Sequence, residues 1–222
     1  MVREISWKVN TLKHQTKEEQ VADYLREGII SGKFPRGSKL KQAEIAESIG
    51  MSITPVREAL KLLAAEGFIL GTSHRGATVA PFDINATEEI VDLRVTLESK
   101  LALRAMERLT TQQVDELRDL QAQLEAAAAR DDKDAVRSIN YRFHEVLYSA
   151  AGLPQTLRFV RALWARYPFD LINRLENRID RASKEHREML GAILSRDEGA
   201  MLSALRSHIR AGWDEFKASY TG

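Results

Sequence analysis

Residues 45–76 read IAESIGMSITPVREALKLLAAEGFILGTSHRG, and this stretch decides the fold of the amino-terminal part of the chain. Val56, Leu60 and Leu63 recur at i, i+4 and i+7, the spacing of one apolar helix face. A shorter apolar helix ends at Gly50, and a glycine-bearing turn follows Gly67. The pattern therefore predicts a short helix, a turn, a second helix and a β-hairpin.

The second helix has a different stripe, through Ile53, Arg57 and Lys61, which is too polar to be core. Ser52 or Thr54 is suited to cap its start. The helix is therefore expected to pack through its apolar face and to leave its amino end exposed. Such an end suits DNA reading, because side chains near it reach base edges while its N–H groups meet phosphate.

The segments around this pair complete the amino-terminal part. Helical periodicity runs from Thr16 to a stop at Gly32, and residues 32–40, which contain one Pro and two Gly, are predicted to form a turn or short extended link. Residues 68–70 and 77–79 are predicted as two short strands around a tip. Residues 1–15 show no periodicity and are interpreted as an arm.

No strand pattern follows Pro81. Asn85 with Glu88 forms a capping-box pattern, as does Thr110 with Gln113. About six amphipathic helices are predicted, at residues 86–108, 111–130, 132–151, 154–178 with a break at Pro168, 183–196 and 198–220. The predicted fold class is mainly α, a winged helix-turn-helix followed by an all-helical bundle. The domains are expected at residues 1–80 and 87–222, with a linker at 81–86.

Composition is that of an ordinary soluble protein, with 222 residues, a net charge of +1 and no cysteine. The missing cysteines exclude disulfides and thiolate metal sites. Residues 1–80 hold 12 Lys and Arg against 9 Asp and Glu, while the remainder holds 21 against 23, a weak basic bias that suits phosphate contact. The sequence has no run of about 18 apolar residues, the length that a membrane-spanning helix needs, and no signal-peptide pattern. A cytoplasmic protein without a membrane partner is therefore expected.

Three histidines of the predicted bundle, His144, His186 and His208, have apolar neighbours at helical spacing. Asn140 lies one turn before His144, on the same face. Taken alone, each histidine is better interpreted as a core residue with a satisfied hydrogen bond than as a ligand. If the four converged, three imidazoles and an amide oxygen would form a divalent metal site with open positions. The spacing does not establish that convergence.

The sequence LKQAEIAESIGMSITPVREALKLLAAEGFI, followed by a turn and ATVAPF, resembles the winged helix-turn-helix of the gluconate-repressor (GntR) family of bacterial transcription regulators. Its most specific block is TPVREAL, residues 54–60. Many relatives have Arg at the position of Ile53, so one expected DNA contact is absent. The resemblance implies a homodimer that reads a pseudo-palindromic operator in double-stranded DNA.

The resemblance implies a set of DNA-contacting residues, with Arg57 foremost. The others are Lys41, Gln42, Ser52 and Thr54, together with His74, Arg75 and Gly76 at the hairpin tip. Lys39 is a further candidate for backbone contact. In isolation the hairpin is equally well interpreted as a solvated surface loop; the preceding helix pair favours the wing.

The carboxy-terminal half resembles the FCD effector domain of the FadR-like branch. In many members, D-x-x-x-H on one helix and one His on each of two later helices bind a metal, which matches Asn140, His144, His186 and His208. Asn140 replaces the usual Asp, so a Zn, Ni or Mn site is expected to be weaker, with an anionic effector supplying the missing charge.

Arg94 matches an Arg that faces the ligand cavity in such domains and would hold a carboxylate. The alternative is a surface ion pair with Asp92 or Glu98. The segment WARYPFD, residues 164–170, is consistent with a cavity wall, with core or with a subunit interface.

The leading interpretation is a DNA-binding regulator, most simply a repressor, released by a small carboxylate or sugar acid. A metal-dependent hydrolase or oxygenase built on the histidines is the second hypothesis, but the chain has no H-E-x-x-H, nucleophile elbow or phosphate-binding glycine loop. The third hypothesis keeps DNA binding and makes the bundle a dimerisation module without a ligand. No enzyme activity is expected under the first or the third.

Overall fold

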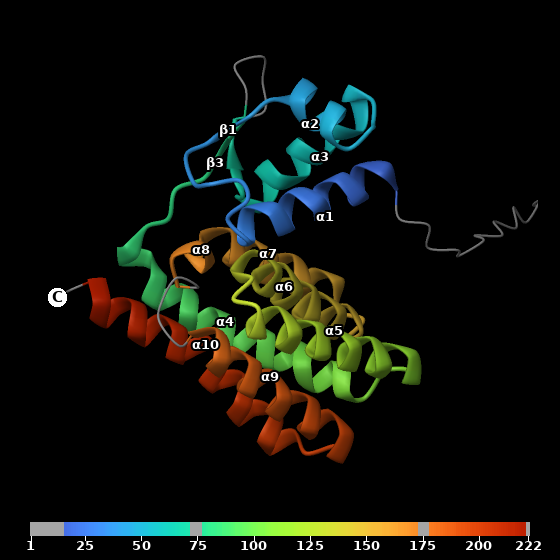
Figure 1. Cartoon of the computed structure of the whole chain (residues 1–222), viewed down its shortest axis with the longest axis vertical. Helices are drawn as coiled ribbons and strands as arrows, with labels where there is room; N and C mark the ends of the chain where they lie inside the picture. Colours follow the sequence, from blue (N-terminus) through green and yellow to red (C-terminus); the bar gives the residue numbers. More distant parts are fainter. Residues whose placement is uncertain (1–15, 72–76, 173–177, 221–222) are drawn as a thin grey trace, which may run out of the picture.

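The structure is a computed structural model, and it describes residues 16–71, 77–172 and 178–220. The predicted fold class is confirmed: a small winged part is followed by a helical bundle (Figure 1). The residues proposed as an arm, 1–15, lie outside the described ranges. The winged part consists of α1 (Lys17–Ile30), β1 (Lys39–Leu40), α2 (Gln42–Ser48), α3 (Ile53–Glu66), β2 (Ile69–Leu70) and β3 (Ala77–Val79).

The sheet of the winged part has the strand order β1-β3-β2, and both pairings are antiparallel. β2 and β3 form the predicted hairpin. β1 lies in the segment that was expected to be a turn or link, where Leu40 is buried and pairs with Ala77. The burial of Leu40 explains why a segment rich in Pro and Gly still contributes a strand, since its apolar side chain faces the core.

The bundle follows the predicted helices closely. It contains α4 (Ile84–Met106), α5 (Thr111–Ala129), α6 (Lys133–Ser149), α7 (Pro154–Arg166), α8 (Phe169–Ile172), α9 (Arg178–Ser195) and α10 (Glu198–Tyr220). The break at Pro168 separates α7 from α8, and Thr110 with Gln113 forms the expected capping box. None of the described helices is both long and apolar enough to cross a membrane.

The predicted capping box of Asn85 and Glu88 is wrong. The helix begins one residue earlier than Asn85, and Asp83 caps it by accepting a hydrogen bond from the Asn85 N–H at 2.9 Å. The Glu88 carboxylate instead accepts hydrogen bonds from Trp213 Nε1 at 2.9 Å and Lys217 Nζ at 3.0 Å. Contact with α10 therefore outweighs the local capping pattern, and it holds the first and last helices of the bundle together.

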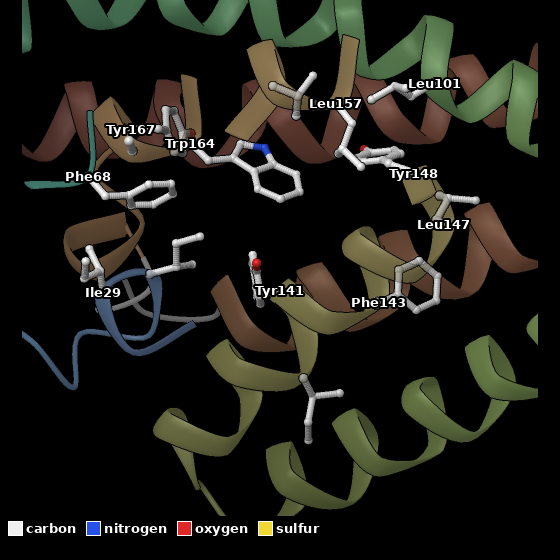
Figure 2. Packing of buried hydrophobic residues seen from close by; sticks show 14 of the residues in the cluster. Ile29, Phe68, Leu101, Tyr141, Phe143, Leu147, Tyr148, Leu157, Trp164 and Tyr167 are labelled. Carbon is white, nitrogen blue, oxygen red and sulfur yellow. The ribbon is translucent and has the colours of Figure 1, made fainter. Parts of the chain in front are cut away.

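Within the winged part, helix α1 lies on the side that faces the bundle (Figure 1), in contact with both α3 and α6. On the α3 side, the Arg26 guanidinium binds the Glu66 carboxylate in bidentate fashion, at 2.6 and 2.9 Å. On the α6 side, Ser138 donates a hydrogen bond to Glu27, and Arg137 donates one to the backbone carbonyl of the α1 cap. The apolar core is continuous across this junction, as the neighbouring side chains of both parts in Figure 2 illustrate.

The loop after α1 is also fastened to the bundle. Arg36 donates hydrogen bonds to three backbone carbonyls, those of Ala80 at 3.1 Å, Ala165 at 3.2 Å and Tyr167 at 2.7 Å. The first of these carbonyls follows β3, and the other two belong to the end of α7. A single guanidinium thus ties the α1–β1 loop, the end of the wing and the bundle together.

We expect Arg26→Met to lower the free energy of unfolding by about 3 kcal/mol, because it leaves the Glu66 carboxylate, whose side chain is only 12% exposed, without its cation. Urea denaturation followed by circular dichroism measures this. Arg118→Met is the matched control, since Arg118 pairs with Asp115 on the exposed surface, where ion pairs contribute about 0–1 kcal/mol. Equal losses in the two variants would contradict the importance assigned to the junction.

Candidate nucleic-acid interface and histidine cavity

Helix α3 is packed from one side only. Val56, Ala59, Leu60 and Leu63 are at most 1% exposed and face the core of the winged part. The opposite stripe is open, with Ile53 and the side chain of Arg57 both 51% exposed. The predicted division of this helix into a buried and an exposed face is therefore confirmed.

The amino end of α3 is exposed, and none of the described side chains caps its first-turn N–H groups. Ser52 holds the N-cap position with an extended backbone, but its side chain makes no capping hydrogen bond. Thr54, the alternative cap, already lies inside the helix and is exposed. Arg57 has one weak neighbour, Glu58, at 3.4 Å from its Nε. First-turn N–H groups, two hydroxyls and a guanidinium thus share one exposed end, a set suited to phosphate and base edges.

The remaining predicted DNA residues are placed less uniformly. Lys41 occupies the N-cap position of α2 without a capping hydrogen bond from its side chain. It is exposed, and its Nζ lies 2.6 Å from the Glu44 carboxylate. Gln42, the first residue of α2, is half-buried, and Lys39 is exposed on β1. The tip residues His74, Arg75 and Gly76 lie outside the described residues.

The three histidines converge. His144 comes from α6, His186 from α9 and His208 from α10, and all three are buried. One ring nitrogen from each lies within 4.8 Å of the others, and the Nε2 atoms of His144 and His208 are 3.0 Å apart. Three separate helices therefore bring their imidazoles to one point, which the spacing in the sequence could not establish.

Glu185 orients one of these rings. Its buried carboxylate lies 2.9 Å from Nδ1 of His208. An ionised carboxylate only accepts hydrogen bonds, so with Glu185 ionised and the ring neutral, Nδ1 would carry the proton and the Nε2 lone pair would lie on the side of His144. A carboxylate behind a histidine in this way is the usual support of a metal ligand. The donor set and its supporting group therefore fit a divalent metal.

Two small cavities lie beside the histidines, in which the centre of a water-sized sphere can occupy about 10 and about 20 Å³. Both are lined by Arg94, Asn140, Phe169 and His208, so the two cavities are neighbours that share a wall. The first is lined in addition by Ile30, Tyr141, His144 and Trp164. The structure thus brings Asn140 and Arg94 to the histidine cluster, and the aromatic segment around Trp164 contributes to the wall.

Arg94 is buried, not on the surface. Its Nε donates a hydrogen bond to Glu98 at 2.7 Å, and its guanidinium lies 4.2 Å from the centre of the Tyr167 ring. Burial is the largest single influence and opposes the cation, but the charge and hydrogen bond of Glu98 together with Tyr167 and Tyr148 outweigh it, so the pKa of Arg94 is raised above its usual value. The alternative of a surface ion pair is therefore wrong, because the pair of Arg94 with Glu98 is buried. Its expected partner Glu98 is right, whereas the other candidate, Asp92, pairs with Arg210 of α10.

Glu98 is the centre of a buried network that sequence reasoning missed. Besides the Arg94 hydrogen bond, its carboxylate accepts one from Tyr148 Oη at 2.8 Å and one from Trp164 Nε1 at 2.9 Å. The i, i+4 spacing of Arg94 and Glu98 was a usable signal for the pair, but nothing local indicates the contacts with α6 and α7. Glu185 gave no signal either, because its partner His208 lies on another helix.

Comparison with known proteins finds two family models that match successive parts of the chain. Residues 17–79 match the model described as "Bacterial regulatory proteins, gntR family", and residues 89–211 match the FCD domain.

Curated relatives and solved structures agree with the family models. The chain is 29% identical over 197 residues to the HTH-type transcriptional regulator McbR of Escherichia coli, covering 84% of this chain and 86% of that protein. It is 28% identical over 201 residues to a probable D-xylose utilization operon transcriptional repressor of Paenarthrobacter nicotinovorans, with 90% and 88% covered. The solved E. coli McbR/YncC structure superimposes with a TM-score of 0.78 at 25% identity, over 92% of this chain and 99% of that one.

We expect Glu98→Gln to lower the free energy of unfolding by about 3 kcal/mol, because Arg94 then stays buried without its counter-charge. Chemical denaturation at pH 7 measures the loss. Glu89→Gln makes the same chemical change at an exposed position of the same helix and should change stability by less than about 0.5 kcal/mol. A Glu98→Gln protein as stable as the control would show that the network does not hold Arg94.

Proposed function

Because the chain belongs to the gntR family of bacterial regulatory proteins and carries an FCD domain, we propose that it is a homodimeric repressor released from its operator by a small carboxylate. It is a DNA-binding transcription regulator rather than an enzyme. We assign residues 1–80 to DNA binding, 81–86 to the linker and 87–222 to effector binding and dimerisation. The single observation that carries the effector assignment is a buried arginine beside three converging histidines in a cavity.

In this proposal, two copies of α3 related by a two-fold axis enter successive major grooves of a pseudo-palindromic operator. Arg57 contacts a base or a phosphate, Ser52 and Thr54 contact the backbone at the helix start, and Lys41 and Gln42 position the neighbouring phosphates. The exposure of the α3 amino end supports this arrangement. His74, Arg75 and Gly76 remain assigned to the wing by resemblance alone.

Repression is favoured because one of the relatives is named a probable operon repressor. The regulator is placed in the cytoplasm, where its DNA lies, without a membrane partner. A ligand that binds the bundle shifts the population towards arrangements of the two DNA-binding domains that no longer fit the operator. It does so only to the extent that it prefers those arrangements.

Arg94 is proposed to hold the effector carboxylate. Among the described residues its hydrogen bond runs from Nε to Glu98, which leaves the two terminal nitrogens of the guanidinium for a bidentate contact. The aromatic rings of Trp164 and Phe169 and the apolar side chain of Ile30 provide the remaining wall. Such a cavity suits a short organic acid better than a large or highly charged ligand.

His144, His186 and His208, with Asn140, are proposed to hold a divalent Zn, Ni or Mn ion. When bound, the ion supplies positive charge beside the effector carboxylate. Asn140 contributes an amide oxygen without charge, so this site is weaker than one with Asp at that position. Glu185 keeps His208 in the tautomer that a ligand needs.

We expect Arg57→Ala to weaken DNA binding by about 1–3 kcal/mol or more, because it removes one potentially bidentate contact. The DNA is a duplex selected from a random pool by the wild-type chain, and fluorescence anisotropy measures affinity. Arg118→Ala removes the same charge from α5, away from α3. Both variants should keep the wild-type circular dichroism spectrum and melting temperature. Affinity of Arg57→Ala equal to that of the control would discard the assignment of α3.

We expect Zn²⁺ and a short carboxylate such as acetate or butanoate to raise the melting temperature more together than the sum of their separate effects. Arg94→Gln should remove the carboxylate effect, and His186→Ala the Zn²⁺ effect. Asn140→Asp should tighten Zn²⁺ binding about tenfold in the absence of carboxylate, because it restores a charged ligand.

Protein purified without a His-tag, followed by differential scanning fluorimetry and calorimetric titration, provides the measurement. No shift with any carboxylate or metal would favour a bundle that only dimerises. Full zinc occupancy that survives mild chelation would contradict the weak site.

A further inference from the structure

The cavity beside the histidines has one firmly held wall. The Arg94 and Trp164 side chains in it both donate hydrogen bonds to Glu98, and Tyr148 donates a third. Arg94 is also stacked over Tyr167, whose backbone carbonyl accepts a hydrogen bond from Arg36. Each of these side chains thus makes at least one hydrogen bond or ring contact. A ligand would have to break these contacts before this wall could move.

A second wall is built differently, from Ile30 and Tyr141. Ile30 is the last residue of α1, inside the segment that matches the gntR-family model, so the DNA-binding part itself lines the cavity. Tyr141 is 5% exposed and stacks edge-on with Trp164 at 5.8 Å (Figure 2). In the described structure its hydroxyl has no hydrogen-bond partner, in contrast to that of Tyr148. The side chains of Ile30 and Tyr141 are thus held by apolar packing, while hydrogen bonds from Ser138 and Arg137 hold the carboxyl end of α1 beside Ile30 to α6.

The space between the walls is small. In the part lined by Ile30, the centre of a water-sized sphere can occupy only about 10 Å³, far below the roughly 300–1,000 Å³ of typical ligand pockets. A ligand of more than a few non-hydrogen atoms therefore has to displace a wall. Because a packed interior does not compress, the side chains of Ile30 and Tyr141, which make no hydrogen bonds to Glu98, yield before those of Arg94 and Trp164. A larger displacement of Ile30 then also strains the contacts of Ser138 and Arg137 with the end of α1.

Displacement at Ile30 has a direct route to DNA. Arg26 lies one turn before Ile30 on α1 and binds Glu66 at the end of α3. A shift of the α1 carboxyl end consequently moves α3 relative to the bundle, and in a dimer it changes the distance between the two α3 helices. No relay through further elements is required.

We propose that Ile30 is an effector-contacting residue supplied by the DNA-binding domain, and that displacement of Ile30 by the effector is what releases the operator. This rests on the proposed function, because it takes Arg94 as the anchor of the carboxylate. Ile30 then sets the length of acid that fits. Acids too short to reach Ile30 bind without releasing DNA, and longer ones bind and release it.

The test uses the full-length protein with Zn²⁺ and the straight-chain carboxylates from acetate to hexanoate. Calorimetric titration gives the affinity for each acid, and anisotropy with the selected duplex gives the loss of DNA affinity that each acid causes. Ile30→Val and Ile30→Ala enlarge the cavity in two steps, so the milder variant covers the case in which the larger change fails to fold. Val21→Ala is the control, since Val21 is a buried α1 residue outside the cavity lining.

We expect wild-type protein to lose about tenfold or more in DNA affinity with the longest acid that binds. In Ile30→Ala, and less in Ile30→Val, longer acids should bind about 3–10-fold more tightly while the loss of DNA affinity falls to about twofold or less. Val21→Ala should retain the wild-type profile for both measurements.

The outcomes separate the two ideas. If acids bind in wild-type protein and Arg94→Gln abolishes this, but the Ile30 variants keep the wild-type chain-length and release profiles, the role of Ile30 is overturned and the effector site stands. If Val21→Ala changes the profiles as the Ile30 variants do, the effect is general loosening of α1 and the contact is again overturned. If no acid binds wild-type protein, the effector assignment fails, and the Ile30 proposal fails with it.

Discussion

Helix α1 is packed on both sides at once, and the relation between the winged part and the bundle depends on this. On one side Arg26 holds Glu66 of α3, with Arg26 only 4% exposed. On the other, Ser138 and Arg137 of α6 bind the carboxyl end of α1. Because a buried cation is tolerated only with its partner in place, α1 cannot leave α3 without a large cost. Under the proposed mechanism, α1 and α3 would therefore shift together relative to α6, at the cost of the Ser138 and Arg137 contacts.

Buried charge in the described structure is concentrated where function is proposed. Glu98 accepts three hydrogen bonds beside the cavity, Glu185 supports His208, and the buried Arg26 of α1 is held by the partly exposed Glu66 of α3. An interior built for stability alone gains little from such groups, since apolar residues of the same volume are often as stable. What these carboxylates provide is direction: each fixes the orientation of an arginine or an imidazole that packing alone would leave free to rotate.

Local sequence patterns were sufficient to predict the features that depend only on residues close together in the chain. The two faces of α3 follow from helical spacing, and Thr110 with Gln113 caps α5 as its pattern predicts. Local patterns failed where a distant residue decides the outcome. Glu88 satisfies its acceptor capacity with Trp213 of α10 instead of capping α4, 125 residues away in the chain.

The candidate site shows the same limit. The convergence of the three histidines came from the family resemblance and is borne out as geometry, while whether they bind a metal stays a prediction. No sequence pattern indicated the contact of Glu185 with His208, the contact of Glu98 with Tyr148 or the position of Ile30 at the cavity. Each is a contact between different helices that only packing brings together. A periodic pattern reports which face of a helix is buried; it does not report which helix lies opposite.

The charge balance of the cavity connects the Asn140 substitution to the kind of effector proposed. Arg94 and Glu98 neutralise each other at 2.7 Å, and Glu185 adds one negative charge behind His208. Under the proposed assignment a divalent ion would leave the site with an excess of one positive charge, which a single carboxylate balances. An Asp at position 140 would already supply that charge, and a second anion would then enter a neutral site with less electrostatic attraction. On that assignment, Asn140 in place of Asp would weaken the hold on the metal alone and strengthen its dependence on a monoanionic ligand, so the proposal expects metal and effector to bind as a pair.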